Sequence, residues 1–389
     1  MRKIFFIAFI GLFLTTYSCK KENEHDNSKK TTSINGFLPK SITVDIPSSI
    51  CNSSSTSSLK STLNDSLSLT GNQLYGMLRV FIYIGKASAN YMQAIVSAID
   101  HYKLENVTTL EYTSDQDSLL KVITVTKNVT LLGKTWEYNL IIKDKASGKT
   151  GMQVCWNNNP AKAIVIVNPY IINHNDNDGK LQKNSMYKIE YSSAGEIVGY
   201  DRYMIISISG LEKDKINNYW ANSLKMFVGA KGSVIDIYGN TNHPNCRIID
   251  QSWKDGRNWA FGARSDSGKN IAVAQVALPP CSLNSTDKIF SAYSLDSVLK
   301  TECRLAWASF TDTHPLLRDT VNKLINVITK NAKTPAFFNK NGFVSAGTLP
   351  IVTPQNPEFS GFTPEFINIE KLMPFVPKEI SEQKIEFME

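Results

Sequence analysis

Between residues 119 and 278 the chain alternates apolar and polar side chains with a period of two. This pattern constrains the fold more than any other feature, because successive side chains of a β-strand point to opposite faces of a sheet. A turn at 144–148 joins two such runs, so 134–156 is predicted to form a β-hairpin. The first strand of this hairpin would carry its large apolar residues on one face: Trp136, Tyr138, Leu140 and Ile142.

The same alternation recurs along the rest of this region. Further strands are predicted at 119–128, 161–168, 186–191, 199–209, 223–230, 233–239, 258–264 and 270–277. Most of the connections between them are short, whereas parallel strands need crossovers of a dozen residues or more. The sequence therefore predicts one large, strongly curved antiparallel meander.

Two helices are predicted on either side of this sheet in the sequence. Residues 74–102 carry apolar side chains at spacings of three and four, with a small-residue notch at Gly85 and Ser88 where we expect a bend or break. A coiled-coil dimer is the alternative, but heptads with charged flanking positions are missing. The second helix is expected at 314–331, with Pro315 in its first turn. The predicted fold class is α+β, with both helices packed on the curved sheet.

The last 55 residues have an unusual composition. Seven of the fifteen prolines and eight of the eighteen phenylalanines lie in 335–389. Prolines disfavour regular helices and central strands, while so many phenylalanines would not remain in a solvated linker. We therefore predict a single α+β domain at 71–334, followed by an extended arm at 335–389 that is docked on it.

The N-terminus carries an export signal. Arg2 and Lys3 precede an apolar run over 4–14 that is shorter than the roughly 20 residues of a membrane-spanning helix. The run ends just before Cys19, and a polar segment follows. This pattern resembles bacterial lipoprotein signal peptides, although Thr16 stands where those signals usually have an aliphatic residue. The resemblance implies that 1–18 is removed, that Cys19 is lipidated, and that the protein is anchored in the cell envelope, on the outer membrane, on its periplasmic or surface side.

Residues 19–70 are predicted to form a tether, because serine and threonine runs leave few apolar side chains to bury. Four Asp-Ser/Thr-apolar triplets resemble the O-glycosylation acceptor of a lipoprotein-rich Gram-negative phylum. Ser66 lies in the tether and is the best candidate acceptor among them.

Enzyme and metal motifs are missing. The net charge of +7 is spread along the chain without a basic block, which argues against a nucleic-acid partner. The five histidines form no recognisable catalytic or metal-ligating arrangement, so we expect no catalytic residues, no metal and no cofactor. Beyond the lipidation site five cysteines remain, and their disulfide connectivity is left open: Cys51, Cys155, Cys246, Cys281 and Cys303.

Three functional hypotheses follow. The scale and strand order resemble the half-barrels of bacterial lipoprotein carriers, which implies a non-enzymatic binder of an apolar ligand or a partner protein, with Trp136, Tyr138 and Trp156 as ligand-binding residues. The alternative is a surface lipoprotein that binds or hydrolyses glycans by stacking sugars on some of its six tryptophans: Trp136, Trp156, Trp220, Trp253, Trp259 and Trp307. A third hypothesis is a structural partner in an envelope complex, held through the Pro/Phe-rich arm.

Overall fold

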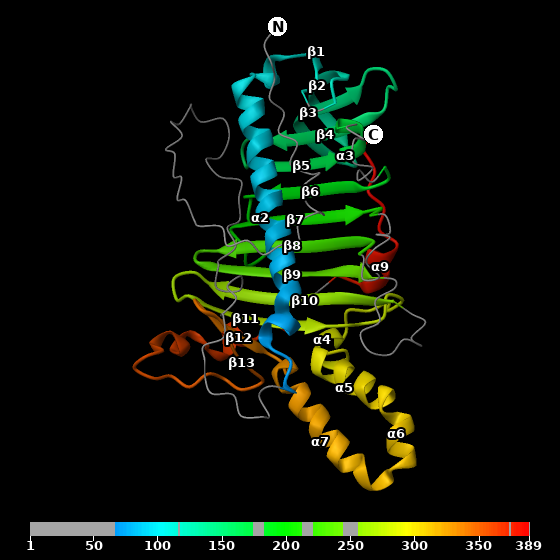
Figure 1. Ribbon diagram of the computed structural model, residues 1–389. Coiled ribbons are helices and arrows are strands. Elements are labelled where there is room, and N and C mark those ends of the chain that lie inside the picture. Colours follow the sequence, from blue (N-terminus) through cyan, green and yellow to red (C-terminus); the bar gives the residue numbers. More distant parts are fainter. Residues whose placement is uncertain are drawn as a thin grey trace. The chain divides into compact units, whose positions relative to one another are not determined.

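A computed structural model describes residues 67–115, 117–173, 183–211, 221–243, 256–372 and 375–388. Its main feature is a 13-stranded sheet in which the described pairings are antiparallel and the strands follow one another in sequence order (Figure 1). β1 and β13 are its two edges, so the sheet is open. The strands are β1 (Thr109–Thr113), β2 (Leu120–Leu131), β3 (Lys134–Asp144), β4 (Thr150–Asn157), β5 (Lys162–Val167), β6 (Met186–Ser192), β7 (Arg202–Ser209), β8 (Ser223–Lys231), β9 (Val234–His243), β10 (Arg257–Asp266), β11 (Ile271–Ala277), β12 (Ala336–Asn339) and β13 (Gly342–Ala346).

One long helix precedes the sheet in the sequence, and the other helices are short. They are α2 (Gly71–His101), η2 (Leu104–Asn106), α3 (Pro169–Ile172), α4 (Ile289–Ala292), α5 (Leu295–Ala306), α6 (Ala308–Thr313), η4 (Pro315–Leu317), α7 (Arg318–Ile328), η5 (Lys330–Ala332), η6 (Pro357–Gly361), α8 (Pro364–Ile367) and α9 (Pro377–Ser381). Within the described ranges, no helix is both long and apolar enough to cross a bilayer.

Local chemistry sets the ends of α2. Thr70 and Gln73 form a reciprocal capping box, in which Gln73 Oε1 accepts from Thr70 N at 2.8 Å and Thr70 Oγ1 accepts from Gln73 N at 3.3 Å. The helix ends at His101, two residues before Lys103 adopts a left-handed backbone conformation. The helix is uninterrupted through Gly85, so the predicted break is wrong. A single glycine weakens a helix by only about 1 kcal/mol, which the packing of its neighbours can offset.

The chain divides into two compact units. The first comprises Ser88–Glu196 and Ile385–Glu389, and the second comprises Ile197–Lys384 together with the described residues up to Ala87. In the first unit β4 and β5 are buried on both faces, at residues 151–156 and 163–167. Apolar residues of one face are buried and include Leu140, Ile142, Met152, Val154 and Val165.

The second unit contains an aromatic contact between α2 and the sheet. The rings of Phe81 and Phe261 stack with centroids 4.1 Å apart and 7° between their planes. The strand position next to Phe261 is Gly239, where an added Cβ would lie 3.0 Å from the Phe261 ring and 2.4 Å from Lys225 O. A glycine inside a strand marks such a close approach.

The opposite face of the second unit is covered by the C-terminal segment. Five of its apolar residues are buried against Ile271, Val273 and Phe337: Phe359, Phe362, Phe366, Ile369 and Leu372. Buried sheet amides also donate to its backbone, as Asn240 Nδ2 does to Phe375 O and Asn258 Nδ2 to Pro377 O.

The prolines of this C-terminal region do not exclude a central strand, so that expectation from the sequence is wrong. β12 pairs with both β11 and β13 and is therefore a central strand. Pro335 precedes β12 and Pro350 follows β13, so the prolines lie outside both strands and remove no ladder hydrogen bond.

Candidate functional site

The residues predicted to bind a ligand do not form one group. Tyr138 and Trp156 are cross-strand partners on β3 and β4, and their rings stack at 4.8 Å with 9° between the planes. Trp136 instead packs in a cluster with Cys155 and Ile164, and Cys155 lies on the opposite face of β4 from Trp156. The structure thus brings together Tyr138 and Trp156, whereas Trp136 belongs to a different part of the core.

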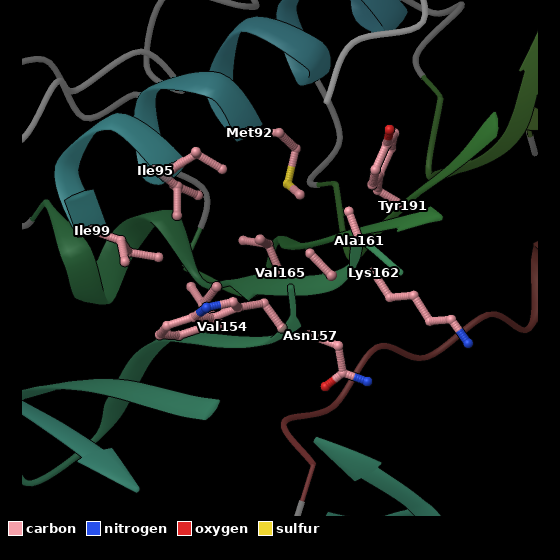
Figure 2. A pocket seen from close by; sticks show the side chains of 12 residues that line it. Met92, Ile95, Ile99, Val154, Asn157, Ala161, Lys162, Val165 and Tyr191 are labelled. Carbon is pink, nitrogen blue, oxygen red and sulfur yellow. The ribbon is translucent and has the colours of Figure 1, made fainter. Parts of the chain in front are cut away.

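Trp156 borders a small cavity beneath the C-terminal half of α2. Met92, Ile95 and Ile99 approach it from the helix, and Val154 and Val165 approach it from the sheet (Figure 2). The cavity has a volume of about 20 Å³. A single water needs roughly 10–15 Å³ of such volume, and ligand pockets measure about 300–1,000 Å³. This cavity therefore has no room for a lipid-like ligand.

Several other predicted residues lie outside the described residues. These are Cys19, Ser66, Cys51, Cys246, Trp220 and Trp253. Of the described tryptophans, Trp259 is half-buried and Trp307 is exposed.

Two of the described thiols are poor nucleophiles. Cys155 is free and completely buried, and burial raises its pKa to about 12. Burial followed by the neighbouring Glu302 also raises the pKa of the free thiol of Cys303. Both thiols are therefore protonated at neutral pH. No group of three or more His, Cys, Asp or Glu side chains in the described part of the chain has the geometry to hold a metal ion.

A larger open groove lies in the first unit, with a volume of about 960 Å³. β3, β4, α3, the segment before β6 and the C-terminal residues form its walls. The lining residues are Ile141, Lys143, Lys149, Thr150, Gln153, Asn168, Tyr170, Ile171, Lys183, Asn184, Phe387 and Met388. Its size lies near the upper end of the usual range for ligand sites, roughly 300–1,000 Å³.

A register shift between β3 and β4 shapes one wall of this groove. Lys143 pairs with Thr150 while Ile142 pairs with Met152, which leaves Gly151 as the additional residue of a β-bulge. An added Cβ at Gly151 would lie 2.9 Å from the Ile172 side chain. The glycine therefore allows α3 to pack directly on β4. Asn168 begins α3 by accepting a hydrogen bond from Ile171 N at 3.1 Å.

The C-terminus forms another wall and is held by a buried amide. Gln153 Nε2 donates to Met388 O at 2.9 Å, and Met388 N donates to Gln153 Oε1 at 2.7 Å. This paired hydrogen bond uses both polar ends of the amide and fixes Phe387 and Met388 beside the strand.

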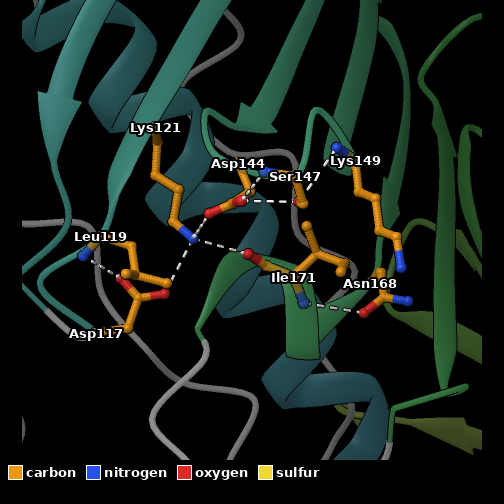
Figure 3. A network of polar contacts seen from close by, with 8 residues as sticks. All are labelled: Asp117, Leu119, Lys121, Asp144, Ser147, Lys149, Asn168 and Ile171. Carbon is orange, nitrogen blue, oxygen red and sulfur yellow. Dashed lines mark hydrogen bonds and ion pairs between the residues drawn. The ribbon is translucent and has the colours of Figure 1, made fainter.

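A buried lysine connects the turn between β3 and β4 to α3. Lys121 Nζ lies 3.0 Å from Asp117 Oδ2 and 3.3 Å from Asp144 Oδ2, and it donates to Ile171 O at 2.9 Å (Figure 3). Only 1% of the Lys121 side chain is exposed. This network therefore positions both the turn that carries Lys149 and the helix that carries Tyr170.

Asp144 is ionised within this network. Burial by itself would raise the pKa of Asp144, but hydrogen bonds from Ser147 and the adjacent Lys121 outweigh that effect and hold the pKa below its usual value. Ser147 N and Oγ donate to Asp144 Oδ1 at 2.8 and 2.7 Å. The negative charges of Asp144 and Asp117 are thus directed at Lys121.

The groove is basic and rich in hydrogen-bond donors. Lys143, Lys149 and Lys183 supply its charge, and none of the three forms an ion pair with another described residue. Lys183 Nζ lies 5.5 Å from the centre of the Tyr170 ring, and Lys149 extends toward Asn168 (Figure 3). No carboxylate belongs to the described lining. Such a surface is suited to a ligand that carries negative charge.

Sequence reasoning missed this site. Lys143 lies near the end of β3, and Lys149 lies directly before β4. Tyr170 and Lys183 lie about 20 and 35 residues further along the chain. No spacing rule connects these positions.

Comparison of the chain with protein-family models, with curated proteins and with solved structures found no match in any of the three.

Proposed function

We propose that this protein is a non-enzymatic envelope lipoprotein, anchored to the outer membrane through Cys19, that binds an acidic saccharide in the groove of the first unit. The signal-like segment over 1–18 and the polar residues after Cys19 support the anchor. The observation that supports an acidic ligand is that Lys143, Lys149 and Lys183 line one groove of about 960 Å³. None of these lysines forms an ion pair with another described residue. We further propose that the sheet curves into a half-barrel-like form and that the helices pack on it.

The contrast between the two cavities favours the glycan-binding hypothesis over an apolar ligand. The cavity beneath the C-terminal half of α2 measures about 20 Å³, whereas the groove is nearly fifty times larger and combines polar with apolar walls. A carrier of apolar molecules would need the opposite arrangement.

The chemistry of the groove indicates the class of saccharide. Ammonium groups bind carboxylate or sulfate as point charges. Thr150 and Asn184 add neutral hydrogen-bonding groups, and the Tyr170 ring adds a flat apolar surface beside them. A short uronic acid or sulfated oligosaccharide combines these three kinds of group in one molecule.

Titration calorimetry on the mature chain carrying Cys19→Ala, which removes the lipid, tests this proposal. The ligands are trigalacturonate, a sulfated heparin hexasaccharide and, as a neutral control, maltohexaose. We expect binding of an acidic saccharide that weakens as salt is raised from 0.05 to 0.5 M, because the lysines are exposed to screening. Each exposed lysine–anion pair contributes about 0.2–1 kcal/mol, so each single Lys→Ala variant should bind roughly 1.5- to 5-fold more weakly.

Lys145 provides a matched control. It lies two residues from Lys143 but forms an ion pair with Glu111 at 2.7 Å and does not line the groove. Lys145→Ala should leave the affinity unchanged, whereas a variant with Lys143, Lys149 and Lys183 all replaced by alanine should lose most of it. Equal affinity for maltohexaose, unchanged affinity in the triple variant, or no binding of either acidic saccharide would contradict the proposal.

A further inference from the structure

A helical hairpin in the second unit presents a feature that saccharide binding does not use. α5 and α7 pack together with α6 at the turn between them (Figure 1). Cys303, Val321 and Ile325 form the apolar contact between the two helices. A buried ion pair of 2.6 Å between Arg257 of β10 and Glu302 of α5 fixes the base of the hairpin to the sheet. The base is therefore firmly held.

The tip of this hairpin is apolar and exposed. Over 13 consecutive positions, five large apolar side chains face solvent, with Leu316 94% and Trp307 40% exposed: Leu305, Trp307, Phe310, Leu316 and Leu317. α6 buries no residue at all. Scattered exposed apolar residues are normal, but a contiguous group marks a docking surface. We call these five residues the hairpin tip.

Several polar side chains between the residues of the hairpin tip have partners within the hairpin itself. Thr311 Oγ1 donates to Ala308 O at 3.0 Å, Thr313 Oγ1 donates to Phe310 O at 3.0 Å, and His314 Nδ1 lies 3.1 Å from Phe310 O. Asp312 and Arg318 neutralise each other at 3.5 Å. Polar groups that already have partners lower the cost of leaving water.

The chain also enters the second unit at the base of this hairpin. Leu69 N donates to Ile328 O, the last residue of α7, at 2.9 Å, and Asn331 Nδ2 donates to Leu69 O at 2.8 Å. Leu67, the first described residue, lies 48 positions after Cys19. A chain that comes from a membrane anchor therefore reaches the second unit beside the hairpin; this step alone depends on the proposed lipidation.

From these observations we infer that the hairpin tip is a second membrane contact, which inserts Trp307, Phe310 and Leu316 into the interfacial layer of a lipid bilayer. Tryptophan favours that layer because its large ring is apolar while its N–H remains hydrated, and phenylalanine and leucine add apolar area that enters the lipid. The strength of such binding increases with the apolar area that enters the lipid.

Vesicle flotation of the mature chain carrying Cys19→Ala tests this inference without the lipid anchor. The vesicles contain phosphatidylethanolamine and phosphatidylglycerol in a 3:1 ratio. We expect the protein to float, and a Trp307→Ser/Phe310→Ser/Leu316→Ser variant to show at least a tenfold lower partition coefficient. Ile351→Ser/Val352→Ser removes two other exposed apolar residues of the second unit and should float like the parent. Leu316→Ser alone, at the most exposed position of the tip, should give an intermediate loss and keep the native circular dichroism spectrum.

The outcomes separate this inference from the proposed function. Failure of the parent to float, or equal flotation of the triple variant, would overturn the membrane contact whatever the groove binds. Loss of a dimer in the triple variant, without any vesicle binding by the parent, would assign the tip to a second copy of the chain and also overturn it. Fatty-acid labelling at Cys19 and saccharide titration test the proposed function independently.

Discussion

Replacement of Lys121 by methionine is the most informative test of how the groove is built. The substitution keeps a long apolar side chain but removes the ammonium group. Three acceptors then lose their donor: Asp117 Oδ2 at 3.0 Å, Asp144 Oδ2 at 3.3 Å and Ile171 O at 2.9 Å. The Asp117 side chain is 1% exposed, so its charge would remain buried without its counterion.

The expected loss of stability follows from these contacts. Removal of one partner of a buried ion pair costs about 3–5 kcal/mol. The lower half of this range applies here, because Asp144 Oδ1 keeps its two hydrogen bonds from Ser147 and Asp117 Oδ1 keeps the one from Leu119 N. We therefore expect Lys121→Met to lower the free energy of unfolding by about 3–4 kcal/mol.

Urea unfolding followed by circular dichroism measures this change, and Lys145→Met is the matched control. The Lys145–Glu111 pair has a similar geometry at 2.7 Å, but both side chains are nearly half exposed, so its loss should cost no more than about 1 kcal/mol. Adding Asp117→Asn and Asp144→Asn to Lys121→Met should recover part of the loss, because no buried charge then remains. Equal destabilisation by Lys121→Met and Lys145→Met would refute the reasoning.

Four further predictions concern individual residues. The folded-state pKa of Asp144 is lowered, so its contribution to stability is present above the ordinary aspartate pKa of about 4 and lost as pH falls below it. When the urea midpoint of unfolding is measured as a function of pH, Asp144→Asn should therefore reduce the decrease of the midpoint below about pH 4. Gly239→Ala should lower the free energy of unfolding by about 1–3 kcal/mol, because the new Cβ would lie 2.4 Å from Lys225 O. In the same urea assay Gly76→Ala should raise it by up to about 1 kcal/mol, because a Cβ at this position of α2 meets nothing within 4 Å. Phe81→Ala removes the ring that stacks on Phe261 and should lower the free energy of unfolding by about 3–5 kcal/mol relative to the parent protein, measured by urea unfolding. Cys155, with a pKa of about 12, should resist a thiol reagent at pH 8 until the protein unfolds; rapid labelling of Cys155 in the native protein, located by peptide mapping, would show that its burial is wrong.

The sequence was sufficient for the sheet because its alternation is a local property. The ten strands predicted between 119 and 278 occur within a few residues of their predicted ends, from β2 to β11. The first helix was equally clear, because apolar residues recur along all of 74–102. The predicted second helix is α7, flanked by η4, which begins at Pro315, and by η5. In each case, the secondary structure is determined by side chains that are near one another in the sequence.

The helices that were missed depend on distant partners. The buried positions of α5 follow a helical spacing, but Glu302 is one of them. Its burial requires Arg257, which lies 45 residues earlier on β10. A buried carboxylate inside an apolar stripe weakens the helical pattern unless its cation is known.

The groove could not be predicted for a related reason. Its three lysines are ordinary surface residues in the sequence, and what groups them is a β-bulge at Gly151 and a four-residue helix. In the sequence, Gly151 is only one glycine inside a predicted strand. Such a glycine is typical of a β-bulge, but it does not indicate which residues the bulge brings together. The buried Lys121 had no sequence signal at all.

The contacts on the two faces of the sheet explain why we propose binding at the groove and at the hairpin tip. In the first unit Val154 faces the α2 cavity while its neighbour Gln153, on the opposite face, holds the backbone of Met388. In the second unit Phe261 stacks on Phe81 of α2, while Asn258, on the opposite face, donates to Pro377 O in the C-terminal segment. Each unit thus has one sheet face in contact with the helix and the other in contact with the C-terminal residues. Because both faces already make contacts, we place the ligand and the membrane contact where elements other than the strands take part: the groove that α3 and the C-terminal residues form with β3 and β4, and the tip of the α5–α7 hairpin.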